Sequence, residues 1–131
     1  MRRLDWLTGR PIAHRGRHNE AAGIVENTAT AMTAALEGHY GIEVDLQITA
    51  DGEAMVHHDD CLGRLTDGAG KLAAMTAADL KSIPFKATTD RMMTLGELCD
   101  LVAGRETIVL ELKSAFNGDR RVALRQRGQG R

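Results

Sequence analysis

The segment Gly41-Ile42-Glu43-Val44-Asp45-Leu46-Gln47-Ile48 alternates apolar and polar side chains without a break. A period of two is the signature of a β-strand, in which successive side chains point to opposite faces of the sheet. Glu43 and Asp45 therefore leave the same face, and their carboxylates converge. Two carboxylates this close cost free energy unless a cation lies between them. The segment predicts a strand with a cation-binding face, and a solvated polar face is the alternative.

The residues before this strand predict a shorter strand, a long loop and a helix. Residues 11–13 are an apolar stretch that leads into His14, and a polar loop follows as far as Glu26. A loop of this length is often functional. A helix is predicted over 28–40, because apolar residues recur there at helical spacing behind Asn27, a good N-cap residue.

The residues after the strand predict a β-hairpin. Asp51-Gly52 is a pair favoured at tight turns, and residues 54–58 follow it as a second short strand. A hairpin about this turn brings His58 back beside Asp45. His58 is therefore expected to lie next to the acidic face.

Two further helices and a strand complete the predicted elements. Helices are expected over 76–83, where Pro84 ends the run, and over 94–102, which opens on a capping-box pattern. Residues 107–113 are predicted to form a strand suited to a buried sheet. Because strands and helices interleave, the sequence predicts an α/β fold built from parallel crossover units.

The composition is typical of one soluble globular domain. The chain has 131 residues, 43% of them hydrophobic, and a formal net charge of -1. No apolar run approaches the roughly 18 residues that cross a bilayer, and the start does not read as a secretory signal. We therefore expect a cytoplasmic protein without membrane insertion. Cys61 and Cys99 are too few for a disulfide framework and are expected to be plain thiols.

A second strand repeats the acidic pattern. Glu111 and Lys113 stand two apart in the strand predicted over 107–113, as Glu43 and Asp45 do in the first. Three carboxylates projecting from two strands make an oxygen-rich site. Oxygen ligands suit a hard divalent cation such as Mg²⁺ or Ca²⁺ better than zinc.

Two histidines and two cationic residues lie where α/β proteins place reacting groups. His14 and His58 each end a predicted strand, and two imidazoles can supply a general acid and a general base. Arg15 offers a fork of donors suited to a phosphate, and Lys113 offers a point charge for the same ligand. Phosphate is therefore the predicted ligand class.

The run His57-His58-Asp59-Asp60-Cys61 offers a transition-metal site as an alternative. Adjacent histidines on a strand point to opposite faces, and no second cluster at ligand spacing is present. The oxygen-rich site is therefore the favoured interpretation.

Five ordered motifs resemble those of the glycerophosphodiester phosphodiesterase family. They are Ile12-Ala13-His14-Arg15-Gly16, Glu26-Asn27-Thr28, Ile42-Glu43-Val44-Asp45 with Thr49-Ala50-Asp51-Gly52, His58-Asp59-Asp60 with Leu62, Arg64 and Thr66, and Leu110-Glu111-Leu112-Lys113. The resemblance implies an α/β fold of the TIM-type (β/α) barrel kind. It also implies metal-dependent hydrolysis of glycerophosphodiesters to glycerol 3-phosphate and an alcohol.

The resemblance implies roles for the residues that react and for those that bind metal. His14 and His58 would be the catalytic acid and base, in an order that the sequence leaves open. The divalent cation, Mg²⁺ or Ca²⁺, would be bound by Glu43, Asp45 and Glu111. The glycerol hydroxyl would attack phosphorus and give a cyclic phosphate, which water then opens.

The remaining roles implied by the resemblance concern substrate binding. Arg15 and Lys113 would hold the charge of the phosphate, and Glu26 and Asn27 would support the site. The expected partner is a small glycerophosphodiester.

The length predicts only part of a barrel. A complete barrel has eight strands and about 250 residues, whereas this chain stops after a fourth strand region. We expect the N-terminal half of a barrel over 1–118 and a basic tail over 119–131 that is disordered or marks a truncation, with a helix start over 117–123. A half barrel leaves an unpaired sheet edge and an uncovered apolar face, through which a homo-oligomer can form.

Two alternatives to catalysis stay open. With half of the barrel absent, the same residues would form a non-catalytic phosphoester-binding or assembly fragment. The five arginines of the tail would suit RNA. The tail has no aromatic residue to stack on bases, however, so we expect no nucleic acid partner.

Overall fold

The predicted central strand is present with the predicted bounds. The computed structural model describes residues 11–114 and 118–124, and the side chains as far as Leu112. β2 (Gly41–Ile48) is buried at every residue except Ile48. A strand buried on both faces is typical of a parallel α/β sheet, so the alternative of a solvated polar face is wrong.

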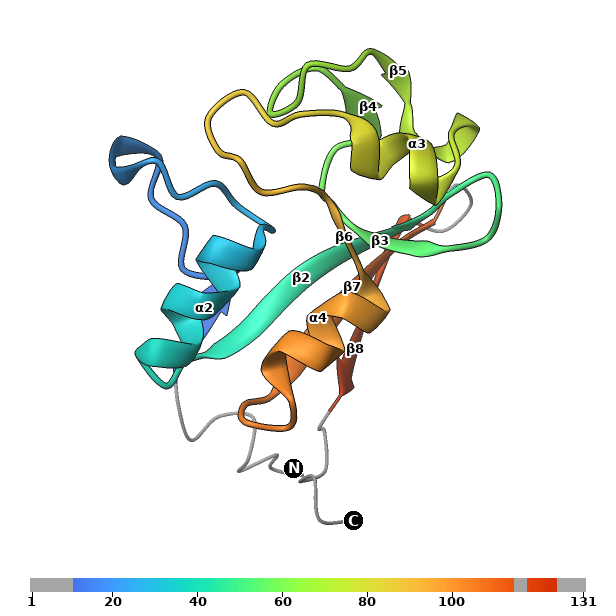
Figure 1. Ribbon diagram of the computed structural model, residues 1–131. Coiled ribbons are helices and arrows are strands. Elements are labelled where there is room, and N and C mark those ends of the chain that lie inside the picture. The colour runs from blue at the N-terminus through green and yellow to red at the C-terminus, as the bar shows by residue number, and fades with distance from the viewer. Residues whose placement is uncertain (1–10, 115–117, 125–131) are drawn as a thin grey trace.

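β2 has neighbours along both of its edges (Figure 1). One edge pairs in parallel with β7 (Ile108–Ser114), and the start of the other pairs in parallel with β1 (Ile12–His14). The end of that second edge pairs with antiparallel β3 (Ala54–Val56) through the predicted hairpin, where Gly52 has a φ of +84°. Within the described residues the sheet has six strands, in the order β6-β3-β2-β7-β8 with β1 beside β2.

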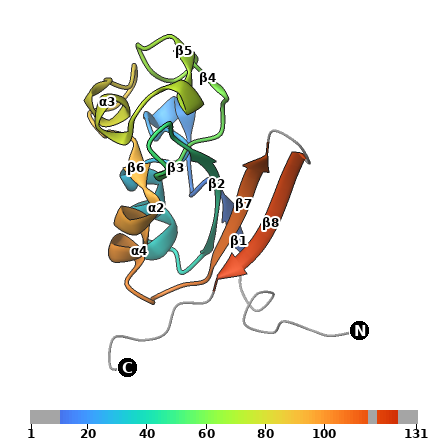
Figure 2. The ribbon, with the colours of Figure 1, turned by 90° about the vertical axis from the view of Figure 1, so that its right-hand side faces the viewer.

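Two helices cover one face of the sheet. α2 (Ala29–Glu37) and α4 (Leu95–Val102) lie on the same side of β2 and contact each other (Figure 2). α4 has the predicted capping box, in which the side chains of Thr94 and Glu97 each accept the other's backbone N–H. The core between helices and sheet contains Met32, Ala35, Leu36, Ile42, Val44, Leu46, Leu98, Val102, Ile108 and Leu110.

The N-cap of α2 is Thr28, and the prediction of Asn27 is wrong. The Thr28 hydroxyl accepts the backbone N–H of Ala31 at 3.3 Å. Asn27 has a left-handed φ of +57°, and its side-chain amide donates to Asp45. Asn adopts this conformation more readily than most residues. Thr28 therefore caps the helix, and Asn27 contacts the acidic face of β2.

The chain between β3 and α4 forms a separate unit at one end of the sheet (Figure 1), which we call the cap segment (residues 57–92). Its elements are β4 (Cys61–Leu62), β5 (Gly70–Lys71), η2 (Leu72–Ala74) and α3 (Ala77–Ser82). The chain then returns to the main sheet as β6 (Met93–Thr94). α3 confirms the helix predicted before Pro84. A second core of Val25, Met55, Leu62, Leu72, Leu80, Phe85 and Met92 holds the cap segment to the hairpin.

The helix start predicted over 117–123 is wrong. β8 (Gly118–Leu124) is a strand that pairs in antiparallel with the whole of β7. The outer edge of β7 would otherwise present a row of unpaired N–H and C=O groups, and pairing them outweighs the weak helical preference of a short segment. β8 therefore covers the outer edge of β7, and the sheet of the described residues stays open, as expected, with β8 at its end. Residues 125–131 lie outside the described residues, and the division of the chain after residue 118 stays a prediction.

The uncovered apolar face is not found among the described side chains. In that part of the chain, Ile12 and Ile48 are the only large apolar side chains that are exposed. The face of β2 turned away from the helices carries Glu43, Asp45 and Gln47, all of them buried. No helix in the described ranges is long and apolar enough to cross a membrane.

Candidate active site

Strand register places four of the predicted site residues on the sheet face opposite α2 and α4. His14 is the register partner of Glu43 between β1 and β2, and Asp45 is the partner of Glu111 between β2 and β7. Side chains at partnered positions of neighbouring strands point to the same face. Lys113 lies two residues beyond Glu111 in β7, and its side chain lies outside the described residues.

The first histidine contacts a buried carboxylate. His14 Nε2 lies 3.0 Å from Glu43 Oε1, and the side chains are 57% and 8% exposed, respectively. A carboxylate partner orients an imidazole ring. The ring of His14 is therefore held by the sheet and still open to a ligand.

Arg15 joins two buried carboxylates. Its Nη1 donates to Glu26 Oε2 at 3.1 Å, and its Nε lies 3.1 Å from Asp45 Oδ2. Asn27 Nδ2 donates to the same Asp45 oxygen at 3.2 Å. Arg15 and Asn27 both have a left-handed φ of +57°, and the Asn27 N–H donates to the Arg15 carbonyl at 2.8 Å. Left-handed non-glycine residues cost free energy and cluster at functional sites, and here both reach Asp45.

A glycine allows the loop that carries Arg15 to lie against α2. Gly16 has a φ of +79°, and a Cβ on it would lie 2.9 Å from the Cβ of Ala31. The next residue, Arg17, donates its backbone N–H to the Ala31 carbonyl at 3.0 Å. Glycine meets both the conformational and the steric requirement at this position.

The second histidine belongs to a chain of charged side chains. His58 Nδ1 lies 2.8 Å from Asp59 Oδ1. Arg64 donates to both oxygens of Asp59, from Nε at 2.7 Å and from Nη2 at 3.1 Å. The same Nη2 donates to Glu26 Oε2 at 2.9 Å. Glu26 therefore links Arg64 to Arg15, and one network connects the His58 loop to the loop after β1.

The guanidinium groups keep the carboxyls of this network ionised. The hydrogen bond from Arg64, helped by His58, lowers the pKa of Asp59 to about 2 against the opposing effect of burial. Burial raises the pKa of Glu26, but the hydrogen bonds and charges of Arg64 and Arg15 outweigh it and lower that pKa overall. Both carboxylates are therefore hydrogen-bond acceptors at neutral pH.

This network predicts an acid-sensitive stability. The pKa of Asp59 is about 2 in the folded chain, against an ordinary value of 3.8, so the unfolded chain binds more protons between these values. The stabilisation is complete above about pH 4 and is lost as the pH falls toward 2. Urea unfolding from pH 6 to pH 2 should show this loss, and Arg64→Met should flatten the curve in the same interval. An unchanged slope in the variant would contradict the assignment.

The three predicted cation ligands, Glu43, Asp45 and Glu111, do not converge closely enough to coordinate one metal ion. Among the described residues, no three histidine, cysteine or acidic side chains lie close enough together to hold a metal ion. Asp45 pairs with Arg15 and Asn27, and Glu43 pairs with His14. The donor set nevertheless fits Mg²⁺ or Ca²⁺ in its chemistry, because it consists of carboxylate oxygens on one face of adjacent strands.

The contacts of His57 do not support the transition-metal alternative. His57 is 2% exposed, and its ring packs against Phe85 with 6.4 Å between the centroids. Burial lowers the pKa of His57 and so favours its neutral ring. His58 contacts Asp59 and Cys61 is exposed, and no metal-holding group is found in the part of the chain that the structure describes.

Most of the chain matches a known protein family in sequence. A family model for the glycerophosphoryl diester phosphodiesterases matches residues 14–120. The chain belongs to this family.

Individual relatives agree with the family assignment. Among curated proteins, the chain is 35% identical over 113 residues to the glycerophosphodiester phosphodiesterase of Caldanaerobacter subterraneus subsp. tengcongensis, a match that covers 80% of this chain and 45% of that protein. Among solved structures, the glycerophosphodiester phosphodiesterase of Agrobacterium tumefaciens matches with a TM-score of 0.70 and 27% identity, over 80% of this chain and 47% of that one.

A third relative was solved with a bound product. It is a phosphodiesterase of Oleispira antarctica in complex with sn-glycerol-3-phosphate, and it matches with a TM-score of 0.70 and 29% identity over 79% of this chain and 44% of that one. The chain thus spans just under half the length of these relatives. The predicted fold class is confirmed as an α/β portion of the family's TIM-type barrel, with an open sheet.

One residue that supports the candidate site was missed by the sequence analysis. Gln47 is 7% exposed, and its Nε2 lies within 3.3 Å of three successive backbone carbonyls, those of His57, His58 and Asp59. It thereby holds the backbone on which the second histidine sits. The alternation of β2 contained the necessary pattern, because Gln47 is the third polar residue on the face of Glu43 and Asp45.

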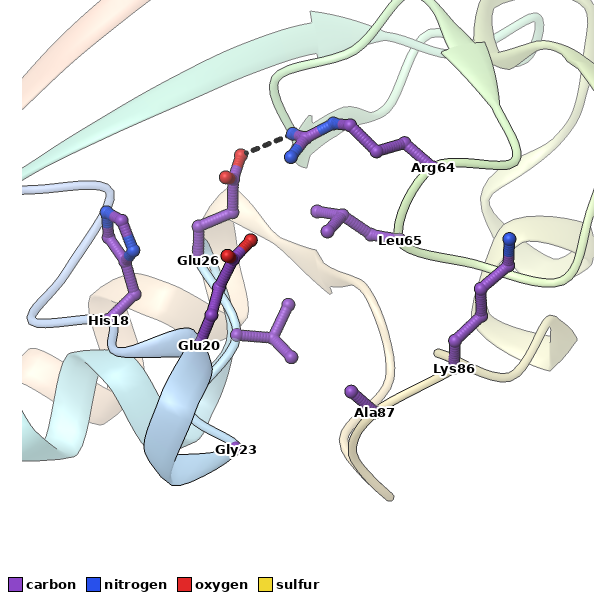
Figure 3. Close-up of a pocket in the computed structure, with 9 residues that line it drawn as sticks. His18, Glu20, Gly23, Glu26, Arg64, Leu65, Lys86 and Ala87 are labelled. Carbon is purple, nitrogen blue, oxygen red and sulfur yellow. Dashed lines mark hydrogen bonds and ion pairs between the residues drawn. The ribbon is translucent and has the colours of Figure 1, made fainter.

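A pocket of about 230 Å³ adjoins the network on the side of the cap segment. Figure 3 shows the Glu26–Arg64 ion pair on its wall, with the Glu20 carboxylate beside Glu26 and the Lys86 side chain across from it. Apolar surface comes from Val25, Leu65 and Ala87. Arg64 thus lines the pocket while it contacts Asp59.

Proposed function

We propose that the chain hydrolyses glycerophosphodiesters to glycerol 3-phosphate and an alcohol. The observation that carries the proposal is that His14 contacts Glu43 on the acidic sheet face, while His58 is joined to Asp45 on that face through the chain of Asp59, Arg64, Glu26 and Arg15. Membership in the glycerophosphoryl diester phosphodiesterase family supports the reaction class. The bound glycerol 3-phosphate of the Oleispira antarctica relative supports the product.

In the proposed reaction the two imidazoles move protons in opposite directions. One of His14 and His58 takes the proton of the glycerol hydroxyl as that oxygen attacks phosphorus, and the other protonates the alcohol as its bond to phosphorus breaks. The resulting cyclic phosphate is opened by water, which restores both protonation states. Arg15 and Lys113 balance the phosphate charge, and Glu26 and Asn27 hold Arg15 and Asp45 in place.

A divalent cation, Mg²⁺ or Ca²⁺, is part of the proposal. Glu43, Asp45 and Glu111 would hold it, since they are the carboxylates on the shared face. When bound, such a cation polarises phosphoryl oxygens and offsets their charge. The structure supports the donor types and their common face.

A second candidate function is binding of phosphoesters without turnover. Two observations favour it. Among the described residues, no three acidic, histidine or cysteine side chains lie close enough together to hold a metal ion, and the chain spans under half the length of its relatives. In that case the arginine network and the histidines bind the phosphate, and the missing ligand geometry prevents hydrolysis. A homo-oligomer and a cytoplasmic location also belong to the proposal, and neither is needed for the chemistry.

Release of glycerol 3-phosphate from glycerophosphocholine tests the two candidates. We expect release in Mg²⁺ or Ca²⁺, loss of release in excess EDTA, and recovery when the cation is restored. Size-exclusion chromatography of the same sample reports whether the chain is monodisperse and whether it associates. A folded, monodisperse chain that binds the diester without releasing product would support the binding function and contradict hydrolysis.

A further inference from the structure

Arg64 reaches the candidate site from the cap segment, although it lies outside the strands that build the site. It follows β4 in sequence, and its side chain is 45% exposed. Its guanidinium nevertheless makes three hydrogen bonds of 2.7 to 3.1 Å, two to Asp59 and one to Glu26. Glu26 is only 8% exposed at its side chain. An arginine with two carboxylate partners has the planar fork that such bridging requires.

Asp59 is the only link between Arg64 and a histidine ring among the described contacts. Its Oδ1 faces His58 Nδ1 at 2.8 Å and also accepts from Arg64, whereas its Oδ2 accepts from Arg64 alone. Gln47 holds the backbone carbonyls of His58 and Asp59 at 2.8 and 2.7 Å. The backbone of this loop is thus held by Gln47, while the carboxylate is held by Arg64.

An ionised Asp59 decides which ring nitrogen of His58 carries hydrogen. A carboxylate has no hydrogen to donate, so His58 Nδ1 must be the donor in the 2.8 Å contact. In the neutral ring the lone pair then lies on Nε2, since the hydrogen bond at one nitrogen sets the state of the other. Within the described part of the chain, Nε2 contacts no other polar group, and the side chain is 31% exposed.

We infer that Arg64 is a positioning residue for His58. It holds the Asp59 carboxylate against Nδ1, and so keeps the ring in the form whose Nε2 is available to a substrate. Through Glu26 it also ties the orientation of His58 to Arg15 on the loop after β1. The ring form of His58 does not depend on catalysis, whereas an effect of Arg64 on turnover rests on the proposed hydrolysis.

The ring form can be read directly from the imidazole nitrogens. In ¹⁵N-labelled chain at a pH where the ring is neutral, long-range ¹H–¹⁵N spectra should show His58 mainly with hydrogen on Nδ1. Arg64→Met and Asp59→Asn should shift the majority to hydrogen on Nε2. Arg64→Lys should restore only part of the wild-type population, because one ammonium group cannot make the bidentate contact.

Lys86→Met is the matched control. Lys86 lines the same pocket and is also a cation of the cap segment, but its Nζ donates to the Gly63 carbonyl and contacts neither carboxylate. It should leave the His58 spectrum unchanged. Hydrogen on Nε2 in the wild type, or an unchanged spectrum in Arg64→Met, would overturn the inference. Because Arg64 is half exposed and outside both cores, its variants are expected to fold.

Kinetics separate this inference from the proposed function. If the chain turns over glycerophosphocholine, Arg64→Met should lower kcat by about 10²-fold, as expected for a misplaced reacting group, with little change in KM. Equal kcat values for Arg64→Met and wild type would contradict the positioning role. If the wild type shows no turnover, the proposed hydrolysis fails, and the nitrogen spectra still decide the role of Arg64.

Discussion

Replacing His58 with asparagine is expected to lower kcat for release of glycerol 3-phosphate by about 10²–10⁴-fold, which is the contribution of one positioned acid or base. Asparagine keeps a side-chain N–H that can reach Asp59, but it cannot take up or release a proton. KM should change little, because the phosphate charge is assigned to Arg15 and Lys113. Initial rates over a range of glycerophosphocholine concentrations give both constants.

His39→Asn is the matched control for this experiment. His39 lies just before β2, at the end of that strand opposite to the His58 loop, and its side chain is 78% exposed. Its φ of +61° is a conformation that asparagine tolerates. The kcat of His39→Asn should equal that of the wild type. An unchanged kcat in His58→Asn would remove His58 from the reaction, and equal losses in both variants would indicate a general effect on folding.

Replacing Asp45 with alanine should cost about 3–5 kcal/mol of stability, the range for removing one partner of a buried ion pair. The Asp45 side chain is 2% exposed and lies 3.1 Å from Arg15 Nε. The change also leaves the buried Asn27 amide without its acceptor. Glu26 still pairs with Arg15, so the loss should fall near the lower end of the range. Urea unfolding at neutral pH measures it.

Two further variants distinguish the ion pair from the shape of the side chain. Asp45→Asn keeps the size of the side chain and a hydrogen-bond acceptor, and it should lose less than Asp45→Ala. In the background of Arg15→Met, Asp45→Ala should cost clearly less than in the wild type, because the two residues are coupled. A stabilising effect of Asp45→Ala would mean that repulsion from Glu43 outweighs the attraction of Arg15.

Elements with strong local patterns were predicted well from the sequence. The alternation of β2 predicted its bounds, and the Thr94–Glu97 pattern predicted the capping box of α4. Both depend on neighbouring residues, so the sequence contains the whole cause. The segment over 117–123 was predicted wrongly because its conformation is decided by pairing with the edge of β7. Such pairing is a tertiary contact, which local propensity does not contain.

The sequence predicted which polar side chains share a face of the sheet, but not how they pair with one another. Residue spacing placed Glu43 and Asp45 on one face, and register brought Glu111 beside Asp45. Residue spacing could not show that Arg15 would pair with Asp45. That contact depends on the left-handed backbone at Arg15 and on the packing of the Arg15 loop against α2. Arg64 was visible only as a motif residue, since its partners come from distant parts of the chain.

The pairing of β7 with β8 limits how this sheet can grow. The seven residues of β8 occupy the outer backbone groups of β7 from Ile108 to Ser114, and they run in the opposite direction. A parallel strand, of the kind that continues a (β/α) barrel, needs those same groups. It can add beside β7 only by displacing β8 along its whole length. β8 is therefore a competitor for the next position in the barrel, and the match to the family model ends within it, at residue 120.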